Sequence, residues 1–78
     1  MEDIVLEVLL LIKAGEGVLA KDVELDPDSF RNLLIEMQME KRLISGVVFA
    51  DNAGKPSIPF TNTAQITKLG EYYILSRL

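Results

Sequence analysis

The segment Leu25–Ala50, LDPDSFRNLLIEMQMEKRLISGVVFA, constrains the fold more than any other part of the chain. Asp26 is a favoured helix N-cap, and Pro27 follows at the first helical position, where its missing N–H costs nothing. The next residues carry the i, i+3, i+4, i+7 spacing of a buried helix face: Phe30, Leu33, Leu34 and Met37. The β-rich run Leu43–Ala50 comes directly after this helix. A helix that leads straight into a strand predicts a mixed α+β domain.

The second half of the segment predicts a β-hairpin. Lys41 and Arg42 fall in the expected last turn of the helix, where cations are favoured by the helix dipole. Gly46 interrupts the strand that follows. The turn-forming cluster DNAGKPS at 51–57 and a return strand at Ile58–Phe60 complete a hairpin with a polar tip.

The region before this segment predicts one more helix and a short connection. Residues 3–14 read as a helix that stops at Gly15. Residues 18–25 are expected to form a short strand at Val18-Leu19 and then a single helical turn at Ala20–Val23. The apolar side chains of the helix divide between two faces, one with Ile4, Val5, Val8, Leu11 and Ile12, the other with Leu6, Leu9 and Leu10. We expect the first face to pack against the stripe that begins at Phe30.

Composition limits the kind of molecule and the kind of chemistry. Seventy-eight residues allow a single domain over 1–78, and 49% of them are hydrophobic. The chain contains no cysteine and no histidine, so the commonest metal ligands and general bases are missing and we expect no cofactor. The apolar run Ile4–Ile12 is shorter than the ~20 residues of a membrane span and has acidic residues before it, so we expect a cytoplasmic protein without a membrane partner.

The order of these elements resembles a winged helix. VELDPDSFRNLLIEMQMEKRLISGVVF is similar to the second half of a winged helix-turn-helix, and QITKLGEYYILSRL is similar to the helix with a Thr-x-x-Gly start that follows the wing in small bacterial proteins. The chain most resembles the YjcQ-like proteins of Gram-positive bacteria and their phages. The resemblance implies a winged helix of three main helices and a hairpin wing, with a last helix from Thr67 to about Arg77. It implies no defined activity.

DNA binding is the first function that this fold suggests. The outward sector of the long helix and the wing carry side chains able to contact bases or phosphates, namely Arg31, Asn32, Gln38, Arg42 and Lys55. These residues indicate a transcription-regulator-like protein on double-stranded DNA. The formal net charge of −4 argues against it, because phosphate contacts dominate DNA affinity. The same cations are equally well explained as solvated surface charges.

Protein binding is the alternative function. Ile35 and Met39 lie one turn apart in the outward sector, where they indicate an adaptable protein surface unless the hairpin or the first helix covers them. Enzyme chemistry is not expected, because the pairs Asp26–Asp28 and Glu36–Glu40 have no nucleophile, histidine or phosphate-binding loop beside them. They are better explained as a helix cap and a solvated face.

A homodimer is expected from the surplus of apolar residues on the first and last helices. Leu6, Leu9 and Leu10 lie outside the expected core face of the first helix. The last helix carries Tyr72, Tyr73, Ile74, Leu75 and Leu78, which point in several directions. A two-fold axis would bury the same patch on both copies. The competing arrangement places the first helix at the centre, with the last helix and the hairpin covering both of its sides.

Overall fold

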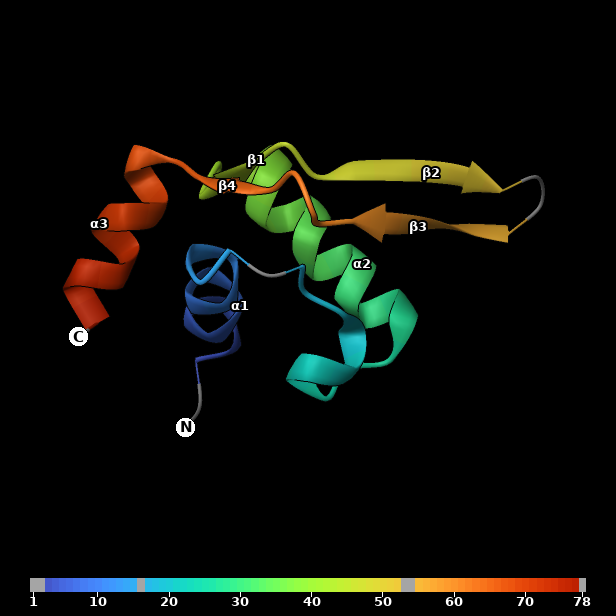
Figure 1. The fold of residues 1–78 in the computed structure, drawn as a ribbon, viewed down its shortest axis with the longest axis horizontal. Helices are drawn as coiled ribbons and strands as arrows, with labels where there is room; N and C mark the ends of the chain where they lie inside the picture. The colour runs from blue at the N-terminus through green and yellow to red at the C-terminus, as the bar shows by residue number, and fades with distance from the viewer. Residues whose placement is uncertain (1–2, 16, 53–54, 78) are drawn as a thin grey trace.

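Three α-helices and two small antiparallel sheets make up the part of the chain that the computed structural model describes, residues 3–15, 17–52 and 55–77 (Figure 1). The elements in chain order are α1 (Ile4–Lys13), the 3₁₀ turn η1 (Ala20–Val23), α2 (Pro27–Ile35), the π-turn η2 (Glu36–Glu40), β1 (Ile44–Ser45), β2 (Val48–Asn52), β3 (Lys55–Phe60), β4 (Gln65–Ile66) and α3 (Lys68–Arg77). The expected α+β architecture with three helices and a hairpin is confirmed.

The long helix begins as the sequence predicts and ends earlier. Asp26 caps it, since its carboxylate accepts the Ser29 N–H at 3.1 Å. The last turn widens into η2, where the Lys41 N–H donates to the Glu36 carbonyl at 2.9 Å. Arg42 then adopts the left-handed conformation, with φ of 54°. The prediction that Lys41 and Arg42 lie in the last helical turn is therefore wrong; the wide turn ends the helix at Glu40 and both cations follow it.

The core joins α1, α2 and the strands. Phe30, Leu34 and Met37 are buried as expected, and Leu33 is partly buried. On α1 the buried residues are Val8, Leu9 and Ile12. The assignment of Leu9 to an outward face is therefore wrong, because its side chain is 0% exposed. The reason is that α1 contacts α3, β4 and η1, so it is covered on more than one side (Figure 1).

The strands form a hairpin and a second, shorter pair. In the hairpin, β2 pairs antiparallel with β3, with Val48 opposite Phe60. The return strand begins at Lys55, three residues before the predicted Ile58, because residues of the turn-forming cluster also take part in the pairing of β2 with β3. β1 pairs with β4 through Ile44 opposite Ile66, and Gly46, with φ of 82°, separates β1 from β2. Two residues of β4 are too short a pattern for sequence analysis to detect.

A short strand was expected at Val18-Leu19, but a threonine side chain pairs with the backbone there instead of a neighbouring strand. The described structure has no strand there, whereas the 3₁₀ turn at Ala20–Val23 is confirmed. The Val18 N–H donates to Thr61 Oγ1 at 2.7 Å, and the same hydroxyl donates to the Val18 carbonyl at 2.9 Å. Thr61 is buried, so this side chain satisfies both backbone groups where a strand would have used a ladder.

The last helix is fastened to the end of the long helix through its first turn. Thr67 caps α3 as expected, because its hydroxyl accepts the Gly70 N–H at 3.2 Å. The same hydroxyl donates to the Arg42 carbonyl at 2.6 Å, and the Thr67 N–H donates to the Leu43 carbonyl at 3.1 Å. A Cβ on Gly70 would overlap the Leu43 carbonyl oxygen. The Thr-x-x-Gly pattern is thus explained by a cap and a close backbone contact.

Replacing Thr61 by valine should lower the free energy of unfolding by about 2 kcal/mol, because the Val18 N–H and carbonyl lose the hydroxyl that pairs with both of them. Thr61→Ser keeps the hydroxyl and should retain most of the stability. Urea denaturation of both variants checks this, and a Thr61→Val protein as stable as the wild type would contradict the assigned role.

Gly70→Ala should also destabilise the fold, by about 2 kcal/mol, although alanine is the better helix former. The added methyl group has to push α3 away from the Leu43 carbonyl. Ser76→Ala, at an exposed position of the same helix, is the control and should change the thermal unfolding midpoint little. Equal midpoints for the two variants would show that the close contact at Gly70 is unimportant.

Candidate interaction surfaces

The outward side of α2 and η2 is an exposed surface with apolar and acidic side chains. We call it the α2 face and define it by six exposed residues: Asp28, Asn32, Ile35, Glu36, Met39 and Glu40. Met39 is 59% exposed and Ile35 is 37% exposed, so neither the hairpin nor α1 covers them. The face carries three carboxylates and no basic residue. Its chemistry is that of an anionic surface with two aliphatic contacts.

Among the residues expected to read DNA, those whose side chains the structure describes do not form one basic surface. Arg31 is turned aside, with its guanidinium 3.3 Å from the Asp28 carboxylate and its side chain 20% exposed. Gln38 is engaged with the backbone, because its amide donates to the Val47 carbonyl at 3.1 Å and accepts the Val47 N–H at 2.8 Å. Asn32 and Arg42 are exposed, and the side chain of Lys55 lies outside the described residues. Gln38 is therefore a link between η2 and β2, which removes it from the expected base-reading set.

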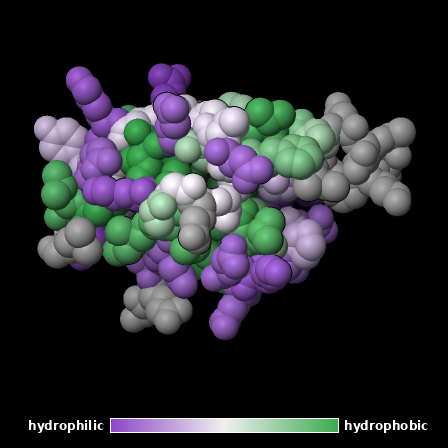
Figure 2. Space-filling view, in the orientation of Figure 1, coloured by the Kyte–Doolittle hydropathy of each residue, from purple (hydrophilic) through white to green (hydrophobic). Residues whose placement is uncertain are grey.

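A second surface lies on α3. Leu69, Tyr72 and Leu75 are 54%, 73% and 69% exposed, and we call these three residues the α3 stripe. Ile74 and Gly70 are buried on the opposite side of the helix, so the apolar residues of α3 do point in more than one direction. The space-filling view shows hydrophobic surface at this end of the molecule (Figure 2).

The other residues expected at an interface have mixed positions. Leu10 is 41% exposed and Leu6 is partly buried. Together with Asp3 and Glu7 they line a shallow hollow on α1. The expected contribution of Leu78 lies outside the described residues.

Tyr73 belongs to a polar cluster that joins the two ends of the described chain. Its hydroxyl lies 2.7 Å and 2.9 Å from the two carboxylate oxygens of Asp3, and Arg77 Nε lies 2.7 Å from Oδ2. Arg77 also stacks over the Tyr73 ring at 4.0 Å. The Asp3 carboxylate caps α1 by accepting the Leu6 N–H. Tyr73, one of the residues expected at an interface, therefore holds α3 against α1.

These contacts change the ionisation of the groups involved. The hydrogen bond from Tyr73 is the main reason why the pKa of Asp3 lies below its ordinary value of 3.8, and Arg77 adds to the effect. Partial burial, with the Asp3 charge beside it, raises the pKa of Tyr73. Sequence reasoning missed the cluster because no local spacing connects residues 70 positions apart.

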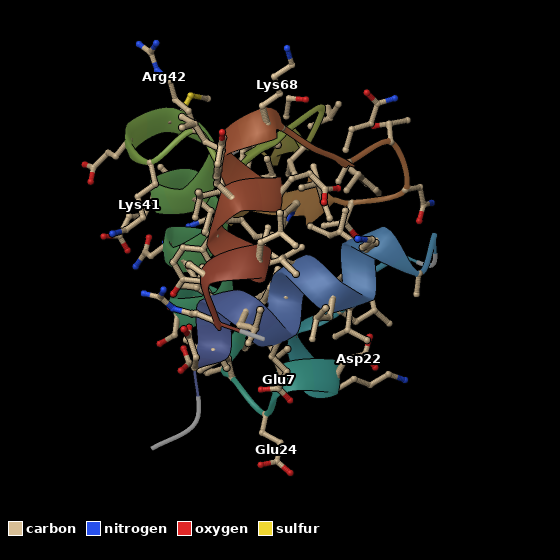
Figure 3. The ribbon with its side chains drawn as sticks, turned by 90° about the vertical axis from the view of Figure 1, so that its left-hand side faces the viewer. Glu7, Asp22, Glu24, Lys41, Arg42 and Lys68 are labelled. Carbon is tan, nitrogen blue, oxygen red and sulfur yellow. The ribbon has the colours of Figure 1, made fainter. Side chains whose placement is uncertain are left out.

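Charged side chains lie beyond both ends of α3 in the view onto that helix, although Asp22 and Glu24 belong to the η1 region, which Figure 1 places below α2 and away from α3. In the view onto α3, Arg42 and Lys68 lie at the end where the helix begins, and Lys41 lies farther along the side of the molecule (Figure 3). Glu7 and Glu24 lie beyond the other end of the helix, beside Asp22 (Figure 3). All six residues are exposed. The adjacent pair Lys41-Arg42 is visible in the sequence. Lys68 lies near this pair because the preceding residue, Thr67, contacts the Arg42 carbonyl, and the sequence does not show that contact.

Over the described residues, no group of three or more acidic side chains is placed to hold a metal ion. No helix in that part of the chain combines the length and the apolar character needed to cross a membrane. No protein-family model, curated protein or solved structure matches the chain. The α2 face and the surface around the α3 stripe are therefore the features of the described chain that bear on its function.

The Asp3 cluster should make stability depend on pH in the acidic range. Because the folded pKa of Asp3 is lowered, its contribution is present above the unfolded value of 3.8 and is lost as the pH falls through the folded pKa. Asp3→Asn keeps a good N-cap but removes the charge. We expect the wild type to be the more stable protein at neutral pH and the difference to shrink below about pH 4. Urea denaturation across this pH range tests it; a constant difference would contradict the assignment.

Proposed function

We propose that the chain is a winged-helix-type, non-enzymatic, intracellular domain that binds another protein through the α2 face. The observation that carries this proposal is the chemistry of that face. Three carboxylates surround the exposed Ile35 and Met39, and the one arginine of α2 is paired with Asp28. A recognition helix of this kind repels the phosphate backbone of DNA and suits a protein partner.

The order of elements supports the winged-helix part of the proposal. A first helix, an extended residue held by Thr61, a short helical turn and the long helix precede a hairpin, and a further helix follows. The YjcQ-like family remains part of the proposal, and the roles of Thr67 and Gly70 support it.

The chemistry of the α2 face indicates the kind of partner. Methionine and isoleucine side chains adapt to apolar residues on an approaching helix, and carboxylates around them attract lysine and arginine. A basic amphipathic helix combines both properties. We therefore assign the α2 face to a cationic helical segment of another protein.

DNA binding is the second candidate, and one observation favours it. Arg42 and Lys68 lie together where α3 begins, with Lys41 farther along the side of the molecule, and these cations could contact phosphates without α2 entering a groove (Figure 3). A homodimer, which the exposed α3 stripe supports, would double this set of cations. Such binding would be independent of base sequence and would weaken steeply with salt.

Two titrations distinguish the candidates. A synthetic amphipathic helix with leucine on one side and lysine on the other should shift the amide NMR signals of residues 28–40, and the double variant Glu36→Lys/Glu40→Lys should weaken the binding at least tenfold. Leu19→Ala, at an exposed apolar position away from the α2 face, is the control and should leave binding unchanged.

A mixed-sequence DNA duplex at about 50 mM salt should produce no change in fluorescence anisotropy. DNA binding that Arg42→Glu abolishes would favour the second candidate. Peptide shifts outside residues 28–40, or a charge-reversed α2 face that still binds, would overturn the first.

A further inference from the structure

The α3 stripe is not covered by any part of the chain that the structure describes. Leu69, Tyr72 and Leu75 are all more than half exposed on one side of a single helix. Three such side chains offer on the order of 400 Å² of apolar surface, which is within the size of patches that are often functional. The same patch on two copies would remove about 800 Å² from water, to which a polar rim adds. This lies below the roughly 1,200 Å² of stable specific interfaces and corresponds to a weak dimer that forms at high protein concentration.

The charges around the stripe identify the cover. The view onto α3 has Arg42 and Lys68 at the end where the helix begins and Glu7, on the adjacent α1, beyond its other end (Figure 3). A surface with an apolar centre, a positive end and a negative end is complementary to a second copy rotated by a two-fold axis perpendicular to α3. A second copy of the chain therefore places an opposite charge at each end of the α3 surface, without an unrelated partner.

We infer that the α3 stripe is the centre of a two-fold homodimer interface, in which the Lys68 end of each copy faces the Glu7 end of the other. The two-fold axis crosses α3 at right angles near Tyr72, so that the two α3 helices pack antiparallel. This arrangement gives the homodimer expected from the sequence a definite surface, and it leaves the α2 face of each copy free. It does not depend on which partner the α2 face binds.

The arrangement assigns different roles to the centre and the rim. The aromatic ring and the two leucines supply the desolvated centre, where most of the binding free energy of an interface lies. Lys68, Arg42 and Glu7 form the exposed rim, which fixes the antiparallel orientation and contributes less. The Asp3–Tyr73–Arg77 cluster lies toward α1 and holds α3 in place without entering the interface.

Sedimentation equilibrium tests the interface on the full chain. We expect the average mass to rise from 8.7 kDa toward twice that value between about 1 µM and about 1 mM protein, the range in which weak interfaces associate. Leu69→Glu should weaken association at least tenfold. Leu19→Glu is a matched control, because Leu19 is also 54% exposed but lies outside α3, and it should dimerise like the wild type.

A charge exchange tests the orientation. Lys68→Glu and Glu7→Lys should each weaken the dimer severalfold, because each places like charges together twice, and the double variant should restore it. Circular dichroism and thermal unfolding of every variant separate a lost interface from a lost fold.

The possible outcomes are distinct. A monomer at all concentrations overturns the dimer altogether. A dimer that Leu69→Glu leaves intact places the interface elsewhere, and a failed charge rescue excludes the antiparallel orientation. None of these results alters the peptide titration of the α2 face.

Discussion

The contact between the Leu43 carbonyl and the first turn of α3 determines how the last third of the chain is arranged. The carbonyl accepts the Thr67 N–H, and the absence of a side chain at Gly70 lets the helix approach it. This contact needs Arg42 in the left-handed conformation immediately before it, because that residue turns the chain out of the π-turn. The wide end of the long helix, the cap of the last helix and the direction of α3 are therefore consequences of one backbone arrangement.

The same arrangement controls the two candidate surfaces. It brings Lys68 next to Arg42, which produces the positive end of the α3 surface, and it turns Leu69, Tyr72 and Leu75 away from the core. The link between Gln38 and Val47 fixes η2 against β2, and Met39 and the acidic side chains of η2 are exposed. Polar contacts to backbone groups thus decide which apolar side chains remain at the surface.

Sequence reasoning succeeded where a local pattern carries the physical cause. The Asp26 cap, the stripe from Phe30 to Met37, the hairpin and the Thr67 cap each depend on residues within one or two turns. It failed where the cause is a distant partner. Nothing near Leu9 indicates that α3 and β4 close over α1, and nothing near Val18 indicates that Thr61, 43 residues away, will satisfy its backbone. The candidate surfaces were foreseen in part, since Ile35 and Met39 are exposed as proposed, whereas Gln38 and Tyr73 are held by contacts that spacing cannot show.

The way in which α3 is held has a consequence for its motion relative to the rest of the chain. Its first turn is fixed by backbone hydrogen bonds and its last turn by the cluster around Asp3, whereas Gly70 and Ile74 are its only fully buried residues among those described. A helix that contributes so little buried apolar area can open without disrupting the core around Leu34. Its amide hydrogens then exchange with solvent through local opening, at a free-energy cost below that of global unfolding. A partner that packs on the exposed side of α3 would slow the exchange of the α3 amide hydrogens more than that of the rest of the chain. Assembly and the folding of the C-terminal helix are therefore thermodynamically coupled.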